Sequence, residues 1–223
     1  MKKVFLFAAA VVAAMTINAE QITFSEVAAK GSLDGEIFAD GDFSLTITDT
    51  DAAKLEIDAN NCWFGDATDQ VKFEYRLKTG GKSSAKNALT LTVPAAGKLY
   101  IYARTGSNSD ATRTVVLTQD GKELYNNVVK EDDAIKVAGL DNKEPEKETN
   151  VYPAIVVDVE EGDIDVAYPV NAVNFYAFAF GAPAAPQAID NVKDAVKAEK
   201  IYRDGQLIIR KNGVEYNALG AQL

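Results

Sequence analysis

Apolar and polar residues alternate along most of the chain between Gln21 and Phe180. Residues 71–78 alternate apolar with charged side chains, and residues 89–93 alternate apolar side chains with threonines. A period of two is typical of β-strands that bury one face and expose the other. With turn residues at intervals of roughly ten positions, the pattern predicts an all-β region of about ten short strands.

Two of the expected strands carry aromatic residues whose positions matter for function. In residues 99–104, the odd-numbered side chains would point into the core, because successive side chains of a strand lie on opposite faces. The opposite face would then carry Tyr100, Tyr102 and Arg104. Residues 174–180 predict a final strand whose Tyr176, Phe178 and Phe180 share one face.

Glycine-containing turns separate the strands and indicate how they pack. Asp120-Gly121 lies between residues 114–119 and 123–129, which predicts a hairpin. Glu161-Gly162-Asp163 separates residues 155–159 from 164–168 in a similar way. We therefore expect an antiparallel β-sandwich of jelly-roll type over residues 20–180. Residues 141–150 are highly charged and predict an exposed loop within it.

The two ends of the chain differ from this central region. Lys2 and Lys3 precede 12 apolar residues, and Ala19 offers a small residue for cleavage, which predicts a secretory signal peptide over residues 1–19. The alternative, an uncleaved anchor, would need roughly 20 apolar residues to span a bilayer. Residues 181–188 predict a proline-containing linker, and residues 189–223 a tail with a short helix and a hairpin at Asn212-Gly213.

Composition excludes several kinds of function. The net charge of −10 argues against nucleic acid as a partner. The chain has no histidine, which excludes Ser-His-Asp catalysis and histidine-ligated metal sites. Its single cysteine, Cys62, is expected to be a small buried hydrophobe, and the lone Trp63 is expected in the core rather than stacked on a ligand. We therefore expect an exported protein that is not an enzyme and has no membrane span once the signal peptide is removed.

Two longer stretches resemble a known kind of domain. Residues 86–94 (KNALTLTVP) and 98–107 (KLYIYARTGS), continued by Tyr152-Pro153, residues 168–170 (YPV) and 174–178 (NFYAF), resemble a non-catalytic β-sandwich domain attached to secreted bacterial pectate lyases. The resemblance covers roughly residues 21–180 and implies binding of pectin or polygalacturonate. The chain itself lacks the repeated coils of the parallel β-helix that the lyases use.

The C-terminal tail resembles another group of segments. Residues 205–210 (GQLIIR) and 212–220 (NGVEYNALG) are similar to the sorting tails of type IX secretion, which implies contact with secretion machinery and a location at the cell surface or outside the cell. The tail departs from that pattern because it lacks a basic final strand. Release from the cell and residence in the periplasm therefore remain open.

A local excess of positive charge points to the same class of ligand without the resemblance. Residues 71–113 contain eight basic and two acidic residues in an otherwise acidic chain. Such a region attracts polyanions, and arginine matches the geometry of a carboxylate. The predicted binding face for an acidic polysaccharide consists of Arg76, Lys78, Lys82, Tyr100, Tyr102, Arg104 and Arg113. The alternative is an ordinary solvent-facing strand whose charges prevent aggregation.

Two further possibilities follow from the acidic residues. Three Asp pairs could contribute ligands to a structural Ca²⁺, although turn capping explains the same spacing; the pairs are Asp40 with Asp42, Asp49 with Asp51, and Asp163 with Asp165. No other cofactor is expected. Paired acids also leave a glycan-cleaving lyase or hydrolase open as an alternative, beside a structural or adhesive protein that binds other proteins.

Overall fold

The computed structural model describes residues 20–25, 32–50, 54–141 and 143–184, together with three strands near the C-terminus. The chain separates into two compact units, Met1–Pro186 and Gln187–Leu223. The predicted signal peptide, most of the predicted linker and the expected helix of the tail lie outside the described residues.

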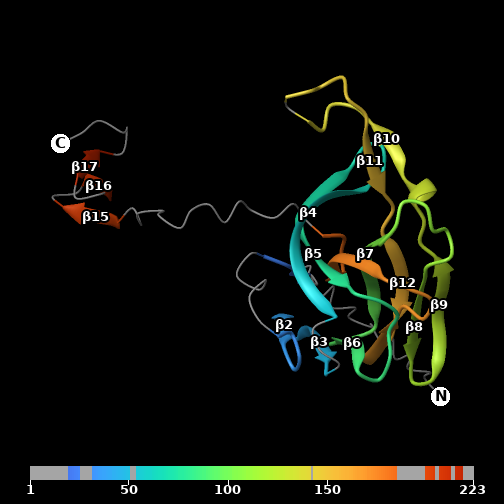
Figure 1. The fold of residues 1–223 in the computed structure, drawn as a ribbon. Helices are drawn as coiled ribbons and strands as arrows, with labels where there is room; N and C mark the ends of the chain where they lie inside the picture. The colour runs from blue at the N-terminus through green and yellow to red at the C-terminus, as the bar shows by residue number, and fades with distance from the viewer. Residues whose placement is uncertain are drawn as a thin grey trace, which may run out of the picture. The chain divides into compact units, whose positions relative to one another are not determined.

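The first unit consists of two β-sheets (Figure 1). Sheet A has the strand order β10-β11-β4-β5-β14-β7-β12, with β1 paired to β14. Its strands are β1 (Glu20–Thr23), β4 (Leu55–Gly65), β5 (Gln70–Thr79), β7 (Gly97–Thr105), β10 (Ile135–Val137), β11 (Thr149–Tyr152), β12 (Ile155–Val159) and β14 (Val173–Phe180).

Sheet B has the strand order β2-β3-β6-β13-β8-β9. Its strands are β2 (Ile37–Asp40), β3 (Phe43–Asp49), β6 (Asn87–Val93), β8 (Thr114–Gln119), β9 (Lys122–Val128) and β13 (Gly162–Ala167). Between β9 and β10 lies a single 3-10 turn, η2 (Glu131–Asp133).

The strand connections confirm the expected all-β sandwich. The chain passes repeatedly from one sheet to the other, for example from β5 to β6, from β6 to β7 and from β7 to β8, as in a jelly roll. Asp120 and Gly121 both have positive φ and form the tight turn of the β8–β9 hairpin. The turn at Gly162 instead carries the chain from β12 in sheet A to β13 in sheet B. One pair, β11 with β4, is parallel and departs from the antiparallel pattern.

Apolar side chains from the facing sides of both sheets form the sandwich core. Leu45 and Ile47 of β3, Leu91 of β6 and Ile101 of β7 are fully buried there. The alternation predicted for residues 89–93 and 99–103 is confirmed, because Leu89, Leu91, Val93, Leu99, Ile101 and Ala103 all belong to this core. Alternation thus correctly identified the inward faces of these strands.

A second cluster lies on the other side of sheet A, which we call its outer face. This outer-face cluster consists of Cys62, Phe64, Val71, Phe73, Tyr102, Tyr152, Tyr176, Ala177, Ala179 and Ala184. The ring of Phe73 in β5 lies 5.1 Å from that of Tyr102 in β7, although β14 separates these strands in the sheet. The β4–β5 ribbon must therefore cross over the outer face, and it is seen as a long arc in Figure 1.

The path of the β4–β5 ribbon and one bulge explain how these strands serve both clusters. Leu77 and Phe73 share one face of β5, yet Leu77 lies in the sandwich core and Phe73 in the outer-face cluster, because the ribbon leaves the plane of sheet A. In β4 the register shift between Ala59 and Cys62 keeps Cys62 on the same side of the ribbon as Ile57. In β14 the register shifts between Phe175 and Ala177. The prediction that Tyr176 shares a face with Phe178 and Phe180 is therefore wrong. A β-bulge inserts one residue, which reverses the faces on either side of it.

The predictions for Cys62, Trp63 and the C-terminal tail had mixed outcomes. Cys62 is buried as expected, but Trp63 is only half-buried and belongs to neither cluster. In the second unit, β16 (Gln206–Lys211) and β17 (Val214–Asn217) form the predicted hairpin. A third strand, β15 (Glu199–Arg203), pairs with β16 and was not predicted. Among the described residues, none forms a helix long and apolar enough to cross a membrane.

Candidate functional site

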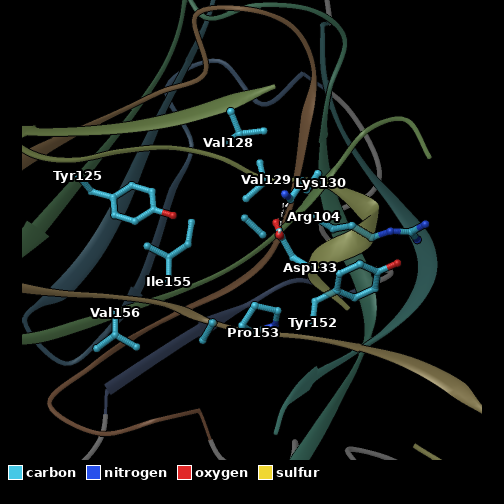
Figure 2. Close-up of a pocket in the computed structure, with 12 residues that line it drawn as sticks. Arg104, Tyr125, Val128, Val129, Lys130, Asp133, Tyr152, Pro153, Ile155 and Val156 are labelled. Carbon is cyan, nitrogen blue, oxygen red and sulfur yellow. Dashed lines mark hydrogen bonds and ion pairs between the residues drawn. The ribbon is translucent and has the colours of Figure 1, made fainter. Parts of the chain in front are cut away.

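A pocket of about 170 Å³ lies where β9, an edge strand of sheet B, approaches β12, an edge strand of sheet A (Figure 2). Three further segments complete its wall: residues 129–133, which follow β9, residues 152–154, which join β11 to β12, and Ala103 and Arg104 of β7. The pocket therefore combines chain segments that are distant in sequence and meet only through the sandwich topology.

One side of the pocket is apolar. Val128 and Val156 are 40% and 48% exposed, and both line the pocket with Ile155 and Pro153. Tyr125 is half-buried, and its hydroxyl points toward the middle of the pocket in Figure 2. Burial raises the pKa of Tyr125. The hydroxyl consequently remains protonated at neutral pH and available as a hydrogen-bond donor.

The opposite side carries two charged residues: Asp133, which ends the turn η2, and Lys130, which directly precedes that turn. The backbone N–H of Lys130 donates to Oδ2 of Asp133 at 3.0 Å, which fixes that carboxylate. Nζ of Lys130 lies 4.0 Å from Oδ1 of Asp133, at the outer limit of an ion pair. The Lys130 and Asp133 side chains are 47% and 31% exposed, so both reach solvent.

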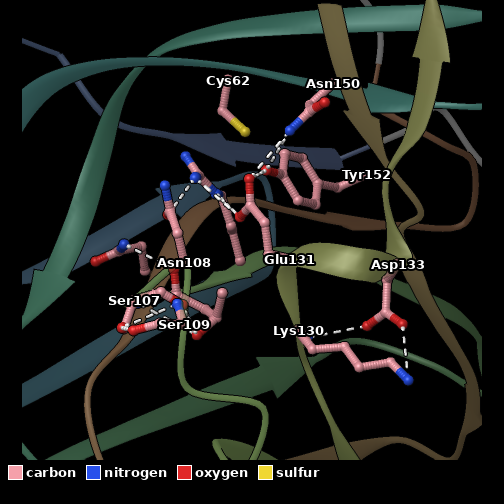
Figure 3. A network of polar contacts seen from close by, with 12 residues as sticks. Cys62, Ser107, Asn108, Ser109, Lys130, Glu131, Asp133, Asn150 and Tyr152 are labelled. Carbon is pink, nitrogen blue, oxygen red and sulfur yellow. Dashed lines mark hydrogen bonds and ion pairs between the residues drawn. The ribbon is translucent and has the colours of Figure 1, made fainter.

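A polar network behind the pocket holds η2 against the outer face of sheet A (Figure 3). Nε and Nη2 of Arg104 donate to Oε2 of Glu131 at 3.2 and 3.0 Å. The hydroxyl of Tyr152 and the amide of Asn150 donate to Oε1 of the same carboxylate at 2.7 and 3.0 Å. The Arg104 guanidinium also lies 5.0 Å from the centre of the Tyr152 ring and donates to Asn108 at 2.8 Å.

The surroundings of Glu131 in this network favour its charged form. Burial alone would raise the pKa of Glu131, but the hydrogen bonds from Tyr152 and Arg104 outweigh it and hold that pKa below its ordinary value. Burial, followed by the hydrogen bond to Glu131, raises the pKa of Tyr152. Burial also raises the pKa of the neighbouring Cys62 thiol to about 12. Glu131 is thus ionised and Cys62 protonated at neutral pH.

The structure distributes the predicted binding residues over several places. Lys78 of β5 and Arg104 of β7 are both register partners of Asn174 in β14, so they lie in one row across the outer face. Arg76 lies beside this row but donates to both oxygens of Asp58, at 2.6 and 3.0 Å. Lys82 is exposed in the loop after β5 and, within the described ranges, forms no ion pair.

The remaining three predicted residues have different surroundings. Tyr102 is 2% exposed beneath the β4–β5 ribbon, and its hydroxyl accepts the backbone N–H of Ala184. It therefore offers no ring face to a ligand. Tyr100 is half-buried beside Val156, its register partner in β12. Arg113 is 9% exposed, and its guanidinium donates to Asp110 and to the carbonyl of Ala172, where it fixes a loop.

Acidic partners cancel most of the basic character that residues 71–113 have in the sequence. Glu56, Asp58, Glu131 and Asp158 lie outside that stretch and pair with Lys78, Arg76, Arg104 and Lys98. The three arginines are fixed in partly buried pairs or loop contacts. The lysine pairs are exposed: Lys78 is 43% and Lys98 53% accessible. Exposed pairs contribute at most about 1 kcal/mol, so these lysines can exchange partners readily.

Of the pocket residues, reasoning from sequence found Arg104 and missed Tyr125, Lys130 and Asp133. These three belong to no recognisable motif, and the register shift in β9 between Tyr125 and Glu123 obscures its alternation. The one available signal was the apolar pair Val128-Val129 after Asn126-Asn127. An apolar pair there indicates that the end of β9 packs against another part of the protein, but does not identify β12 as its neighbour.

The acidic pairs considered for Ca²⁺ make protein contacts. Asp40 accepts the backbone N–H of Gln21, Asp49 accepts those of Lys54 and Leu55, and Asp163 accepts the hydroxyl of Thr92. Asp51 lies outside the described residues. In the part of the chain that is described, no three residues with suitable side chains form a group that could hold a metal ion.

Comparisons with known proteins add little to this description. No protein-family model matches the chain, and no curated protein sequence matches it. One solved structure comes from work entitled "The complexity of the Ruminococcus flavefaciens cellulosome reflects an expansion in glycan recognition". It is 12% identical and aligns over 75% of this chain and 97% of its own, with a TM-score of 0.36. That score is too low for the similarity to support a fold or a function.

Proposed function

We propose that this protein is a non-catalytic carbohydrate-binding protein that takes one sugar ring of an acidic polysaccharide in the pocket between β9 and β12. The observation that carries the proposal is the composition of that pocket: the Tyr125 ring and the exposed Val128 and Val156 on one side, and the charged Lys130 and Asp133 on the other. Small-molecule sites typically combine apolar walls with a few polar groups that orient the ligand.

A sugar ring suits this arrangement for chemical reasons. Its C–H faces pack against aromatic and aliphatic side chains, and its hydroxyls need hydrogen-bond partners at the edge. The cavity of about 170 Å³ is smaller than the roughly 300–1,000 Å³ typical of drug-sized ligands. A single ring of a longer chain is therefore a better match than a large cofactor.

The surface beside the pocket favours an acidic polymer such as polygalacturonate. Val156 leads to the half-buried Tyr100, and the next pair on the same face of these two strands is Lys98 with Asp158. Lys98 is 53% exposed and Asp158 84% exposed, so a polymer carboxylate can replace Asp158 at small cost. Of the predicted face, Tyr100, Lys78 and Lys82 stay candidates for polymer contact, whereas Arg76, Arg104 and Arg113 are held by acidic or backbone partners.

The cellular setting is part of the same proposal. The basic and apolar N-terminus supports export through a signal peptide, and a polysaccharide ligand fits an extracellular or cell-surface location. The C-terminal hairpin supports a sorting role through its resemblance to type IX secretion tails, with secretion machinery as its partner. The resemblance to domains attached to pectate lyases supports pectin as the polymer.

Affinity electrophoresis of the full-length chain tests the proposal, with polygalacturonate, methyl-esterified pectin or a neutral glucan in the gel, each with and without Ca²⁺. We expect retardation by polygalacturonate that weakens as salt rises. The double variant Val128→Ala/Val156→Ala should reduce it, because it removes the exposed apolar wall. The matched control is Ile37→Ala/Val170→Ala, which changes residues that are 63% and 48% exposed and lie outside the pocket.

Three other results would redirect the proposal. No retardation by any polymer would refute it and favour a structural or adhesive role through protein contacts. Retardation that survives the pocket variant but is lost in Trp63→Ala would place the ligand on the β4–β5 ribbon. Release of reducing ends or unsaturated products during incubation would identify a hydrolase or lyase instead.

A further inference from the structure

We infer that the pocket distinguishes a sugar that carries a free carboxylate from its neutral counterpart, and that Lys130 is the residue that makes this distinction. The inference rests on the proposed function and deepens it by naming the ligand class, a hexuronic acid residue, and the groups that read it. It differs from the prediction made from sequence, in which arginines of β5 and β7 bind the acid.

Among the described residues, two charged groups face the pocket. Three of its lining residues are charged, Arg104, Lys130 and Asp133. The Arg104 guanidinium is turned away from Tyr125 and Val156, as Figure 2 shows, and its nitrogens donate to Glu131 and Asn108. Arg104 therefore contributes its aliphatic part to the wall, and any anion in the pocket must be recognised by Lys130.

The partner of Lys130 does not hold it firmly. Its Nζ is 4.0 Å from Asp133 Oδ1, and the lysine side chain is 47% exposed. By contrast, Lys98 lies 2.8 Å from Asp158 and Lys147 lies 2.7 Å from Glu144. A loosely paired, exposed lysine loses little when its ammonium turns toward a ligand, since such pairs contribute at most about 1 kcal/mol.

Asp133 and Tyr125 supply the hydrogen bonds that a sugar hydroxyl requires. Asp133 is fixed by the N–H of Lys130 through Oδ2, which leaves Oδ1 available as an acceptor. The Tyr125 hydroxyl approaches from the other side of the pocket (Figure 2). Since Asp133 repels a carboxylate, a uronic acid must bind with its carboxylate toward Lys130 and its hydroxyls toward Asp133. Lys130 and Asp133 thus orient the sugar ring as well as selecting it.

Isothermal titration calorimetry on the full-length chain tests this inference, with a trimer of galacturonic acid and its fully methyl-esterified form as ligands. Wild type should bind the acid more tightly than the ester. In Lys130→Gln we expect affinity for the acid to fall about tenfold, because a charge-assisted hydrogen bond is lost. Affinity for the ester should change little, so the ratio of the two affinities approaches one.

Two control variants separate this role from a general effect on the pocket. Tyr125→Phe should lower the affinities for both trimers by a similar factor and leave the ratio of the two affinities unchanged. Lys122→Gln removes an exposed lysine at the start of β9, outside the pocket, and should change neither affinity. Circular dichroism of each variant should match wild type, since the altered groups face solvent or the pocket.

The outcomes also distinguish failure of the inference from failure of the proposed function. If wild type binds neither trimer, both are wrong. If wild type binds the two trimers equally, or if Lys130→Gln keeps the wild-type preference for the acid, the protein still binds sugars but Lys130 does not select the carboxylate. If Lys122→Gln also loses the preference for the acid over the ester, that preference arises from long-range charge, and the inference is overturned.

Discussion

The two sheets of the sandwich have the same kind of sequence pattern but very different outer faces. In sheet B, the outward residues of β3 and β6 are small and hydroxyl-bearing: Thr46 is paired with Thr90, and Ser44 with Thr92. All four are partly exposed. In sheet A, the outward Tyr102 and Tyr176 are almost completely buried, because the β4–β5 ribbon crosses over them. Alternation reveals two faces of a strand but does not reveal whether something covers the second.

The difference has a cause in the path of the β4–β5 ribbon and in one bulge. The ribbon leaves the plane of sheet A, so that Phe73 packs on the outer face although Leu77 of the same strand face packs in the sandwich core. The bulge in β14 places both Tyr176 and Ala177 on the outer face. In sheet B, the register shift among the described strands lies at the edge, between β8 and β9. Sheet A therefore supports two hydrophobic clusters, one on each side, whereas sheet B supports one. Four predictions test the comparison.

The largest effect is expected for Phe64→Ala in the outer-face cluster. Phe64 is fully buried and contacts the rings of Tyr102 and Tyr176 at 5.6 and 5.2 Å. Loss of a buried phenylalanine typically lowers the free energy of unfolding by about 3–5 kcal/mol. The matched change on the outer face of sheet B, Thr90→Ala, should stay within about 0.5 kcal/mol. Urea denaturation measures both, and equal small effects would show that the ribbon does not form a true second core.

An intermediate effect is expected for Glu131→Gln, which breaks the network that attaches η2 to the outer face of sheet A. We expect a loss of about 1–3 kcal/mol in unfolding free energy, because the half-buried Arg104 loses its charged partner. The control is Glu56→Gln, whose carboxylate is 59% exposed and pairs with Lys78. It should cost less than about 1 kcal/mol. If the two variants lower the free energy of unfolding by the same amount, the network around Glu131 contributes no more to stability than an exposed ion pair.

The same carboxylate makes part of the stability depend on pH. The pKa of Glu131 is lower in the folded protein than its ordinary value of 4.5, so folding favours the ionised form. This contribution is fully present above the unfolded pKa and is lost as pH falls through the folded pKa. Denaturation curves from pH 6 downward should show a steeper fall for wild type than for Glu131→Gln. Parallel curves would contradict the assignment.

The smallest effect is expected for Lys98→Gln at the exposed edge of sheet A. Lys98 and Asp158 lie 2.8 Å apart, but both side chains are more than half exposed. Unfolding free energy should change by less than about 0.5 kcal/mol, while retardation by polygalacturonate should weaken if the polymer passes over Tyr100. Thermal denaturation and affinity electrophoresis of the same preparation separate the two quantities. A large loss of stability would show that the pair is structural.

Local patterns predicted the parts of the fold that depend on neighbouring residues. The alternation at Leu89 to Val93 and the Asp120-Gly121 turn were both confirmed, because each is decided within a few residues. The bulge before Ala177 was not predictable, since a single inserted residue leaves the composition of β14 unchanged. The crossing of the β4–β5 ribbon depends on contacts between Phe73 and Tyr102, which are 29 positions apart.

The candidate site was less accessible to sequence than the fold. Counting charges over residues 71–113 identified real surface lysines but could not show that Asp58 and Glu131, from other segments, neutralise the arginines. The pocket joins the end of β9 to β12, and only the completed sandwich places them together. Sequence reasoning proposed ligand chemistry for individual residues, whereas the meeting of Tyr125 and Lys130 with Val156 at one pocket is a property of the topology.

The buried thiol on the inner side of the β4–β5 ribbon has a practical consequence. Cys62 of β4 is 4% exposed, and burial raises its pKa to about 12, so in the folded protein almost none of it is the reactive thiolate at neutral pH. An alkylating reagent can reach it only when this part of the ribbon lifts away from β7 and β14. Because Cys62 is the sole cysteine, its labelling rate reports the frequency of that opening without any engineered probe. The same protection keeps the thiol from cross-linking two copies of the protein in an oxidising environment.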